Sequence, residues 1–222
     1  MPVPEAVADS FYINPVLQMD KSSEQAQAGY YGVNLEQGQI KVELTATAHT
    51  GSHRYTFASG QSAKLFIFAG NRSRAQNFSC RQLDDKTLAG VLTTGAGTYH
   101  FHIVFADPVK GCQSWDGQQL NNTAAVDRKV GGLLCDFGRL DHPLGVRIGL
   151  SLTSQEAAQQ NLQAENPQHN FARIRKQART LWNDQLARIQ VQGSKEHKTI
   201  FYTALYHCCF LPVTLTDVAG TY

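Results

Sequence analysis

The sequence predicts a mainly β protein in which an antiparallel β-sandwich is followed by α-helices. Three observations lead to this prediction. Short runs with alternating apolar and polar residues recur up to about residue 152, turn signals separate these runs at regular spacing, and the periodicity becomes helical near residue 153. Regularly spaced short strands of this kind are typical of a sandwich.

The predicted strands begin with a hairpin over residues 30–35 and 39–48, joined at Glu36-Gln37-Gly38. In its second strand Glu43 holds a polar position between apolar ones, so we expect that side chain to face solvent. Turn residues, such as those in Asp141-His142-Pro143, separate the later strands. These further strands are predicted at residues 52–57, 64–68, 78–83, 87–94, 98–106, 124–136 and 145–152.

Helical periodicity begins at Thr153-Ser154-Gln155-Glu156, which fits a capping box with Thr153 as the N-cap. This first helix is expected to end at Glu165, because Asn166-Pro167 disfavours its continuation. A second helix is predicted from about Asn170 and a third over residues 195–210. Both carry apolar residues on more than one side, so we expect them to need packing partners.

Composition limits the function. The chain has 222 residues, of which 42% are hydrophobic and 17% are charged, and these values are typical of a globular protein. The net charge is only +2 and the Lys and Arg residues form no basic run, so no nucleic acid or membrane partner is expected. There are five cysteines. Cys80 could bridge to Cys112 or Cys135 in an exported protein, and buried free thiols are the alternative.

Six segments, taken in order and at their spacing, resemble one known family. They are Ala28–Leu35, Ile40–Thr47, Gly51–Phe57, Asn161–Glu165, Phe201–His207 and Asp217–Tyr222. The family is glycoside hydrolase family 92, which comprises calcium-dependent, exo-acting α-mannosidases. The resemblance implies an N-terminal β-sandwich, a helical linker and a large (α/α)6 barrel, with the active site in the cleft between sandwich and barrel.

The resemblance also implies a division of the chain. Residues 1–24 are an N-terminal segment in which the start of the family is missing, 25–152 the β-sandwich, 153–192 the helical linker, and 193–222 the truncated start of the (α/α)6 catalytic domain. The implied partners are a mannose-containing glycan and the remainder of the catalytic domain. Calcium is the implied cofactor of the full-length enzyme, no metal site is expected in this chain, and a periplasmic or secreted location is favoured.

No catalytic residue is expected in this chain. Inverting glycoside hydrolysis needs two carboxyl groups roughly 6.5–9.5 Å apart, and nothing in the sequence marks two of its acidic residues as a facing pair. The resemblance places the catalytic acid and base, the tryptophan-aspartate motif and most calcium ligands of the family beyond the point that matches Tyr222. In the last segment the family usually shows Asp-Val-Asp-Gly-Arg-Tyr, whereas Ala219 and Thr221 replace a carboxylate and a guanidinium here.

Two residues are candidate sugar contacts, Trp115 and Asp217. Trp115 could stack on a sugar ring or cap the end of the sandwich. Two functions follow. The chain is either the N-terminal portion of an α-mannosidase-like glycoside hydrolase, inactive alone and forming one wall of the cleft, or a free-standing carbohydrate-binding or interaction module. The helical tail favours the first, because a self-contained module has no use for apolar helices that lack partners.

Overall fold

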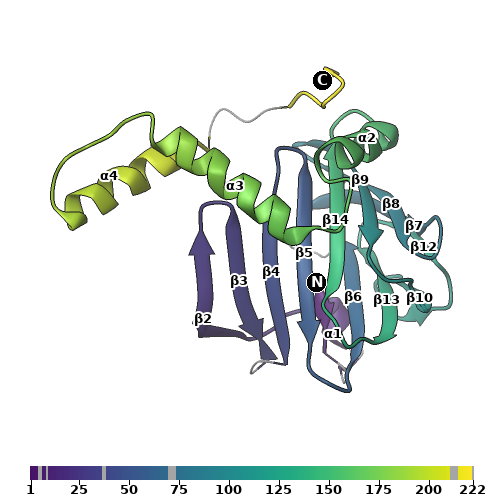
Figure 1. Ribbon diagram of the computed structural model, residues 1–222. Coiled ribbons are helices and arrows are strands. Elements are labelled where there is room, and N and C mark those ends of the chain that lie inside the picture. Colours follow the sequence, from purple (N-terminus) through teal and green to yellow (C-terminus); the bar gives the residue numbers. More distant parts are fainter. Residues whose placement is uncertain (5–6, 9, 37–38, 70–73, 211–214, 222) are drawn as a thin grey trace.

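The computed structural model describes residues 1–4, 7–8, 10–36, 39–69, 74–210 and 215–221. It confirms the fold class, since antiparallel strands dominate the chain up to Ser151 and helices follow from Gln155 (Figure 1). Two short elements precede the main strands, β1 (Pro2–Val3) and the single helical turn α1 (Ser10–Ile13).

The larger sheet has nine strands among the described residues, in the order β12-β7-β8-β9-β14-β5-β4-β3-β2. Every ladder in it is antiparallel, and β14 lies between β9 and β5 in its middle. The chain therefore leaves the sandwich from the centre of this sheet. The strand bounds are β2 Met19–Gln27, β3 Tyr30–Leu35, β4 Ile40–Ala46, β5 Thr50–Phe57, β7 Ala75–Gln82, β8 Thr87–Thr94, β9 Gly97–Phe105, β12 Ala125–Arg128 and β14 Leu144–Ser151.

The smaller sheet has five strands within the described part of the chain, in the order β1-β6-β13-β10-β11. Their bounds are β6 Ser62–Ala69, β10 Gly111–Trp115, β11 Leu120–Asn121 and β13 Gly131–Arg139, beside β1. The single strand predicted over residues 124–136 is wrong, because the chain crosses there from β12 in the larger sheet to β13 in the smaller one. Gly131 permits this crossing, since a Cβ would lie 2.8 Å from Val126 and 3.0 Å from the carbonyl oxygen of Trp115.

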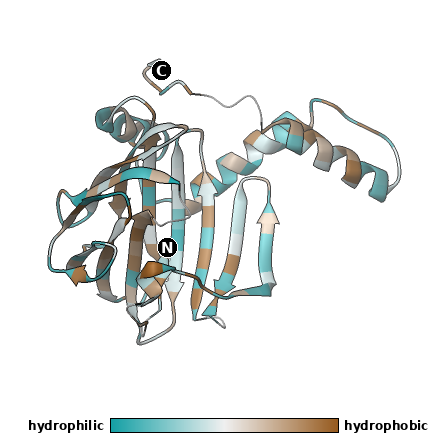
Figure 2. Cartoon of the chain, turned by 180° about the vertical axis from the view of Figure 1, so that it is seen from behind, coloured by the Kyte–Doolittle hydropathy of each residue, from teal (hydrophilic) through white to brown (hydrophobic). Residues whose placement is uncertain are grey.

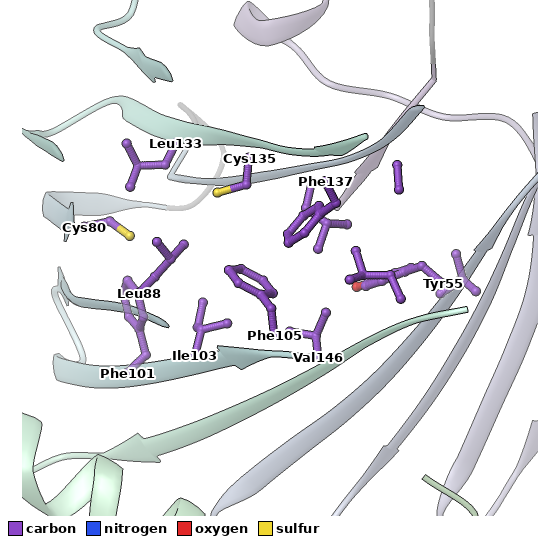
Figure 3. Close-up of a cluster of buried hydrophobic side chains, with 14 of the residues drawn as sticks. Tyr55, Cys80, Leu88, Phe101, Ile103, Phe105, Leu133, Cys135, Phe137 and Val146 are labelled. Atoms are coloured by element: carbon purple, nitrogen blue, oxygen red, sulfur yellow. The ribbon is translucent and has the colours of Figure 1, made fainter. Parts of the chain in front are cut away.

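The main core fills the space between the two sheets (Figure 3). Phe105 of β9 meets Phe137 of β13 edge to face, with 4.9 Å between ring centroids. Both rings are almost completely buried, and contacts of this kind join the two sheets. A second, smaller cluster lies on the outer face of the smaller sheet, where α1 covers it. Its buried members are Val3, Tyr12, Phe66, Trp115 and Leu134.

Helix α2 (Gln155–Glu165) packs on β14 and begins one residue later than predicted. Its N-cap is Ser154, whose side chain accepts from the Ala157 amide at 3.0 Å. The prediction of Thr153 as the N-cap is wrong, because the Thr153 hydroxyl donates to Asp217 instead. Gly149 of β14 lets α2 approach closely, since a Cβ there would lie 2.0 Å from the Ala158 carbonyl oxygen.

Helices α3 (Phe171–Leu186) and α4 (Lys195–Cys208) lead away from the sandwich (Figure 1). Helix α3 packs against β3, β4 and β5 through its buried residues Phe171, Ile174 and Ala178. Helix α4 has no buried residue among those described, and Figure 2 shows apolar positions along its exposed surface. None of the described helices combines the length and the apolar character that a membrane span requires.

Candidate functional site

A polar cluster of buried and half-buried residues joins four segments of the chain. It consists of Thr47 and His49 in the β4–β5 turn, Ser151 at the end of β14 and Thr153 just after it, Asn161 and Glu165 on α2, and Asp217 in the segment 215–221. We call these seven residues the junction cluster. Figure 1 shows the segment 215–221, in yellow, beside α2.

Asp217 is the centre of the junction cluster and is only 5% exposed. Its Oδ2 accepts from the hydroxyls of Ser151 at 2.8 Å and Thr153 at 2.6 Å, and its Oδ1 accepts from the Asn161 amide at 2.6 Å. Burial alone favours the neutral acid and raises the pKa of Asp217, but the three donors and the nearby His49 outweigh it and hold that pKa below its ordinary value. Asp217 is therefore an ionised carboxylate whose two oxygens are both engaged.

Asn161 fixes the chain on either side of that carboxylate. It is completely buried, its amide group donates to the Leu150 carbonyl at 2.8 Å as well as to Asp217, and its Oδ1 accepts from the Val218 amide at 3.0 Å. The turn after Asp217 closes through a bond from the Gly220 amide to the Asp217 carbonyl at 2.8 Å. Gly220 has a φ of +83°, which favours glycine at this position.

Glu165 and His49 form the second half of the junction cluster. Glu165 Oε1 lies 2.5 Å from His49 Nδ1, and its Oε2 accepts from the His49 amide at 2.9 Å and from the Thr47 hydroxyl. The other ring nitrogen of His49 lies 2.8 Å from the Thr216 carbonyl oxygen. Both ring nitrogens thus face acceptors, and only the imidazolium can donate to both.

The charges of this pair stabilise each other. Burial lowers the pKa of His49, but the hydrogen bond and negative charge of Glu165, the Thr216 carbonyl and Asp217 raise it, so that the net pKa lies above the ordinary 6.5. Burial raises the pKa of Glu165, whereas Thr47 and His49 lower it, so that the net pKa lies below 4.5. The pair is therefore charged at mildly acidic pH.

The junction cluster suits positioning rather than acid–base chemistry. All four oxygens of Asp217 and Glu165 accept hydrogen bonds, and both carboxylates are held ionised, so neither residue offers a proton to a substrate. Among the described residues, no group of three or more His, Cys, Asp or Glu side chains could hold a metal ion.

Trp115 lies elsewhere, in β10 of the smaller sheet. It is 2% exposed and meets Phe66 edge to face, with 6.0 Å between ring centroids. This placement favours the capping role over stacking on a sugar, because neither face of the indole is open. The structure does not bring Trp115 and Asp217 together, since Asp217 lies against α2 and the end of β14.

Glu43 is a second buried carboxylate, and the prediction that it faces solvent is wrong. It is 4% exposed and accepts two bonds of 2.8 Å from Arg54, as well as one of 3.1 Å from the Tyr30 hydroxyl. Helix α3 covers this face of the sheet, with Phe171 beneath the Arg54 guanidinium and Arg175 stacked 3.5 Å from the Tyr30 ring. The polar side of β4 is therefore an interface with α3.

Sequence reasoning singled out Asp217 as a candidate sugar contact, and it did not predict the hydrogen bonds that Asp217 makes in the junction cluster. A signal existed for Asn161 and Glu165, because the segment Asn161–Glu165 is one of those that carry the family resemblance. Thr47 ends another of these segments, Ile40–Thr47, whereas His49 gave no signal, since a polar turn of this kind is ordinary between strands. Hydrogen bonds between residues more than 100 positions apart, such as those of His49 with Glu165, leave no local pattern.

The fold and the junction cluster together define a class of protein. It is a β-sandwich followed by helices, in which polar side chains hold the helical part against the sandwich. The comparisons give the family. Residues 3–151 match the glycosyl hydrolase family 92 N-terminal domain, and residues 157–222 match the glycosyl hydrolase family 92 catalytic domain. The chain belongs to glycosyl hydrolase family 92, which confirms the resemblance. No curated protein matches it.

Solved structures of the same family share the fold. The GH92 family glycosyl hydrolase ccman5 has a TM-score of 0.85 and 26% identity, covering 93% of this chain and 31% of its own. An inverting mannosidase from Bacteroides thetaiotaomicron VPI-5482 has a TM-score of 0.89 and 19% identity, with 99% and 31% covered. An α-mannosidase from Bacteroides thetaiotaomicron in complex with mannoimidazole has a TM-score of 0.85 and 18% identity, with 99% and 32% covered. The chain thus spans about 31% of the length of these structures.

The two family domains meet in the junction cluster. Thr47, His49 and Ser151 fall within the match to the N-terminal domain, whereas Asn161, Glu165 and Asp217 fall within the match to the catalytic domain. The cluster is therefore an interface between two domains of the family.

Proposed function

We propose that this chain is the N-terminal portion of an α-mannosidase-like glycoside hydrolase, in which the sandwich forms one wall of the active-site cleft. One observation carries the proposal: the junction cluster ties the sandwich to residues of the catalytic domain through hydrogen bonds to two ionised carboxylates, those of Asp217 and Glu165. Two of the similar structures are mannosidases, one of them with mannoimidazole bound, which supports a mannose-containing glycan as the substrate. A periplasmic or secreted location is part of the same proposal.

In this proposal the residues of this chain position the catalytic domain, and the catalytic acid and base lie in the rest of the full-length enzyme. An inverting hydrolase needs one protonated carboxyl group and one that activates water, roughly 6.5–9.5 Å apart. Asp217 and Glu165 are both held ionised by their donors, so neither can serve as the acid. Calcium belongs, in this proposal, to the full-length enzyme, where it would supply Lewis acidity for the sugar.

The test is an assay with an aryl α-mannoside and with mannobiose, each with and without calcium. The 222-residue chain is expected to show no turnover. A chain carrying the rest of a family 92 catalytic domain is expected to be active and to lose activity in Asp217→Ala through a lower kcat or a lower stability of the domain interface. Calcium-dependent turnover by the 222-residue chain that is lost in Asp217→Ala would overturn the proposal, because it would place the active site here.

The alternative of a free-standing binding module is tested by calorimetry with mannose and mannobiose. Tight binding of either sugar by a stable monomer of the isolated chain would support the hypothesis of a free-standing binding module. The exposed helix α4 counts against that outcome, since a finished module would cover its apolar residues.

A further inference from the structure

Three cysteines meet between the two sheets. Cys112 of β10 and Cys135 of β13 come from the smaller sheet, and Cys80 of β7 comes from the larger sheet that faces it. Cys80 and Cys135 belong to the main core cluster, and Cys112 packs against it. Figure 3 shows the Cys80 and Cys135 side chains in this cluster. All three thiols are free in the structure.

Cys112 and Cys135 are direct partners in the ladder between β10 and β13. Residues directly opposite each other on antiparallel strands project from the same face, with Cα atoms about 4.5–5.5 Å apart. A disulfide needs Cα atoms roughly 4.4–6.8 Å apart, so this pair meets the requirement without backbone movement.

Cys80 has no such relationship to either residue. It lies on the opposite sheet, where one of its ladder partners is Val126 of β12. The register between strands therefore favours a bond between Cys112 and Cys135 over the pairings of Cys80 that the sequence left open.

The two partner thiols differ in access. Cys135 is completely buried, whereas Cys112 is half-buried at the edge of the core. A reagent from solvent therefore reaches Cys112 first. The hydrogen bond with Cys135 also lowers the pKa of the Cys112 thiol, and that bond together with burial raises the pKa of Cys135. Both the access and the acidity favour Cys112 as the attacking group.

We propose that Cys112 and Cys135 form an oxidation site, which a small-molecule disulfide such as oxidised glutathione converts into a cross-strand disulfide. The Cys112 thiolate attacks one sulfur of oxidised glutathione, whose S–S bond breaks and releases one glutathione thiolate that takes up a proton. Cys135 then loses its proton and attacks the Cys112 sulfur of the mixed disulfide, which releases the second glutathione. Two protein thiols are oxidised and one glutathione disulfide is reduced to two thiols.

The bond would close a loop that links the two sheets. Residues 113–134 run from β10 through β11 in the smaller sheet, cross to β12 in the larger sheet and return to β13. A disulfide that closes this loop reduces the conformational entropy of the unfolded chain. The melting temperature of the oxidised protein is therefore expected to be about 5–10 °C higher than that of the reduced protein.

The test uses the full chain with the exposed Cys208 and Cys209 replaced by Ser, so that only the three core thiols remain. After incubation with oxidised glutathione, the intact mass is expected to fall by about 2 Da for the two hydrogen atoms lost, and peptide mapping is expected to join Cys112 to Cys135. Cys80→Ala is the matched control and should still form the bond. Cys112→Ser, at the half-buried position, should not form it and should show no rise in melting temperature.

Three outcomes would overturn the proposal. These are a bridge that maps to Cys80, a stable glutathione adduct on Cys112 that Cys135 never resolves, and an unchanged mass after prolonged exposure to oxidised glutathione.

Discussion

His49 and Glu165 lie 116 residues apart in the sequence, yet His49 Nδ1 is 2.5 Å from Glu165 Oε1 in the structure. Their side chains are only 15% and 17% exposed, so solvent screens the pair weakly. Through Thr216 the same imidazole also holds the segment that contains Asp217. One part of the link between the sandwich and the catalytic-domain residues therefore depends on the protonation state of His49.

The first prediction concerns pH. The pKa of His49 lies above 6.5 and that of Glu165 below 4.5 in the folded chain. The stabilisation from His49 is fully present below pH 6.5 and is lost as the pH rises through its raised pKa, whereas that from Glu165 is present above pH 4.5 and is lost as the pH falls through its lowered pKa. Both contributions are therefore present between about pH 4.5 and 6.5.

An NMR titration of the histidine rings checks this prediction. In Glu165→Gln the pKa of His49 is expected to fall, because burial remains while the negative charge is gone. His142 is the internal control, since its pKa is raised by Asp141 and Asp107 and should not change. A His49 pKa at or below 6.5 in the unaltered chain would contradict the prediction.

A second prediction concerns the anchoring of residues 215–221. In Asp217→Ala the donors of Ser151, Thr153 and Asn161 lose their acceptor, and the free energy of local opening is expected to fall by about 1–3 kcal/mol. Hydrogen exchange of the Val218 amide, which donates to Asn161, measures this opening. Val218→Ala is the matched control, because that side chain is 44% exposed and takes no part in the cluster. Equal exchange rates in the two variants would contradict an anchoring role.

A third prediction tests the packing of α2 on β14. A Cβ at Gly149 would lie 2.0 Å from the Ala158 carbonyl oxygen and 2.8 Å from Leu162, so Gly149→Ala must push the helix outward. The expected loss is about 1–3 kcal/mol in the free energy of unfolding, measured by urea denaturation. Gly95→Ala is the control, since nothing lies within 4 Å of a Cβ there. The prediction fails if both variants unfold at the same urea concentration.

A fourth prediction concerns the apolar residues of α3 and α4. Leu181 and Ile200 are 60% and 62% exposed, so the isolated chain is expected to self-associate as its concentration rises. Replacing both with Lys should shift the sedimentation profile toward the monomer. Val16→Lys, at a 61% exposed position outside these helices, should leave the association unchanged. A monomeric unaltered chain at high concentration would contradict this prediction.

Strands with strong apolar alternation were predictable, and others were not. Residues 40–46 alternate clearly, and β4 is found there. Strand β10, with the sequence Gly-Cys-Gln-Ser-Trp, and the edge strand β2, which is mostly polar and exposed, have no such pattern and were missed. The burial of Glu43 could not be predicted from the alternation of apolar and polar residues. Alternation shows which residues share a face of the sheet, but it does not show whether a helix covers that face. The partners of Asp217 were missed for the related reason that only the tertiary fold brings them together.

The central place of β14 has a consequence for the order of folding events. Strand β14 joins β5 on one side to β9 on the other, so the two halves of the larger sheet share no ladder until β14 arrives. Its partner Thr50 lies 99 residues before Gly149, and such long loops close slowly. During synthesis from the N-terminus, strands β2–β5 are therefore made before β14, and the edge of β5 that pairs with β14 has no partner until β14 has been synthesised. The docking of α2 and the capture of Asp217 need β14 in place, so we expect a ribosome-bound chain ending before β14 to expose this open strand edge to aggregation.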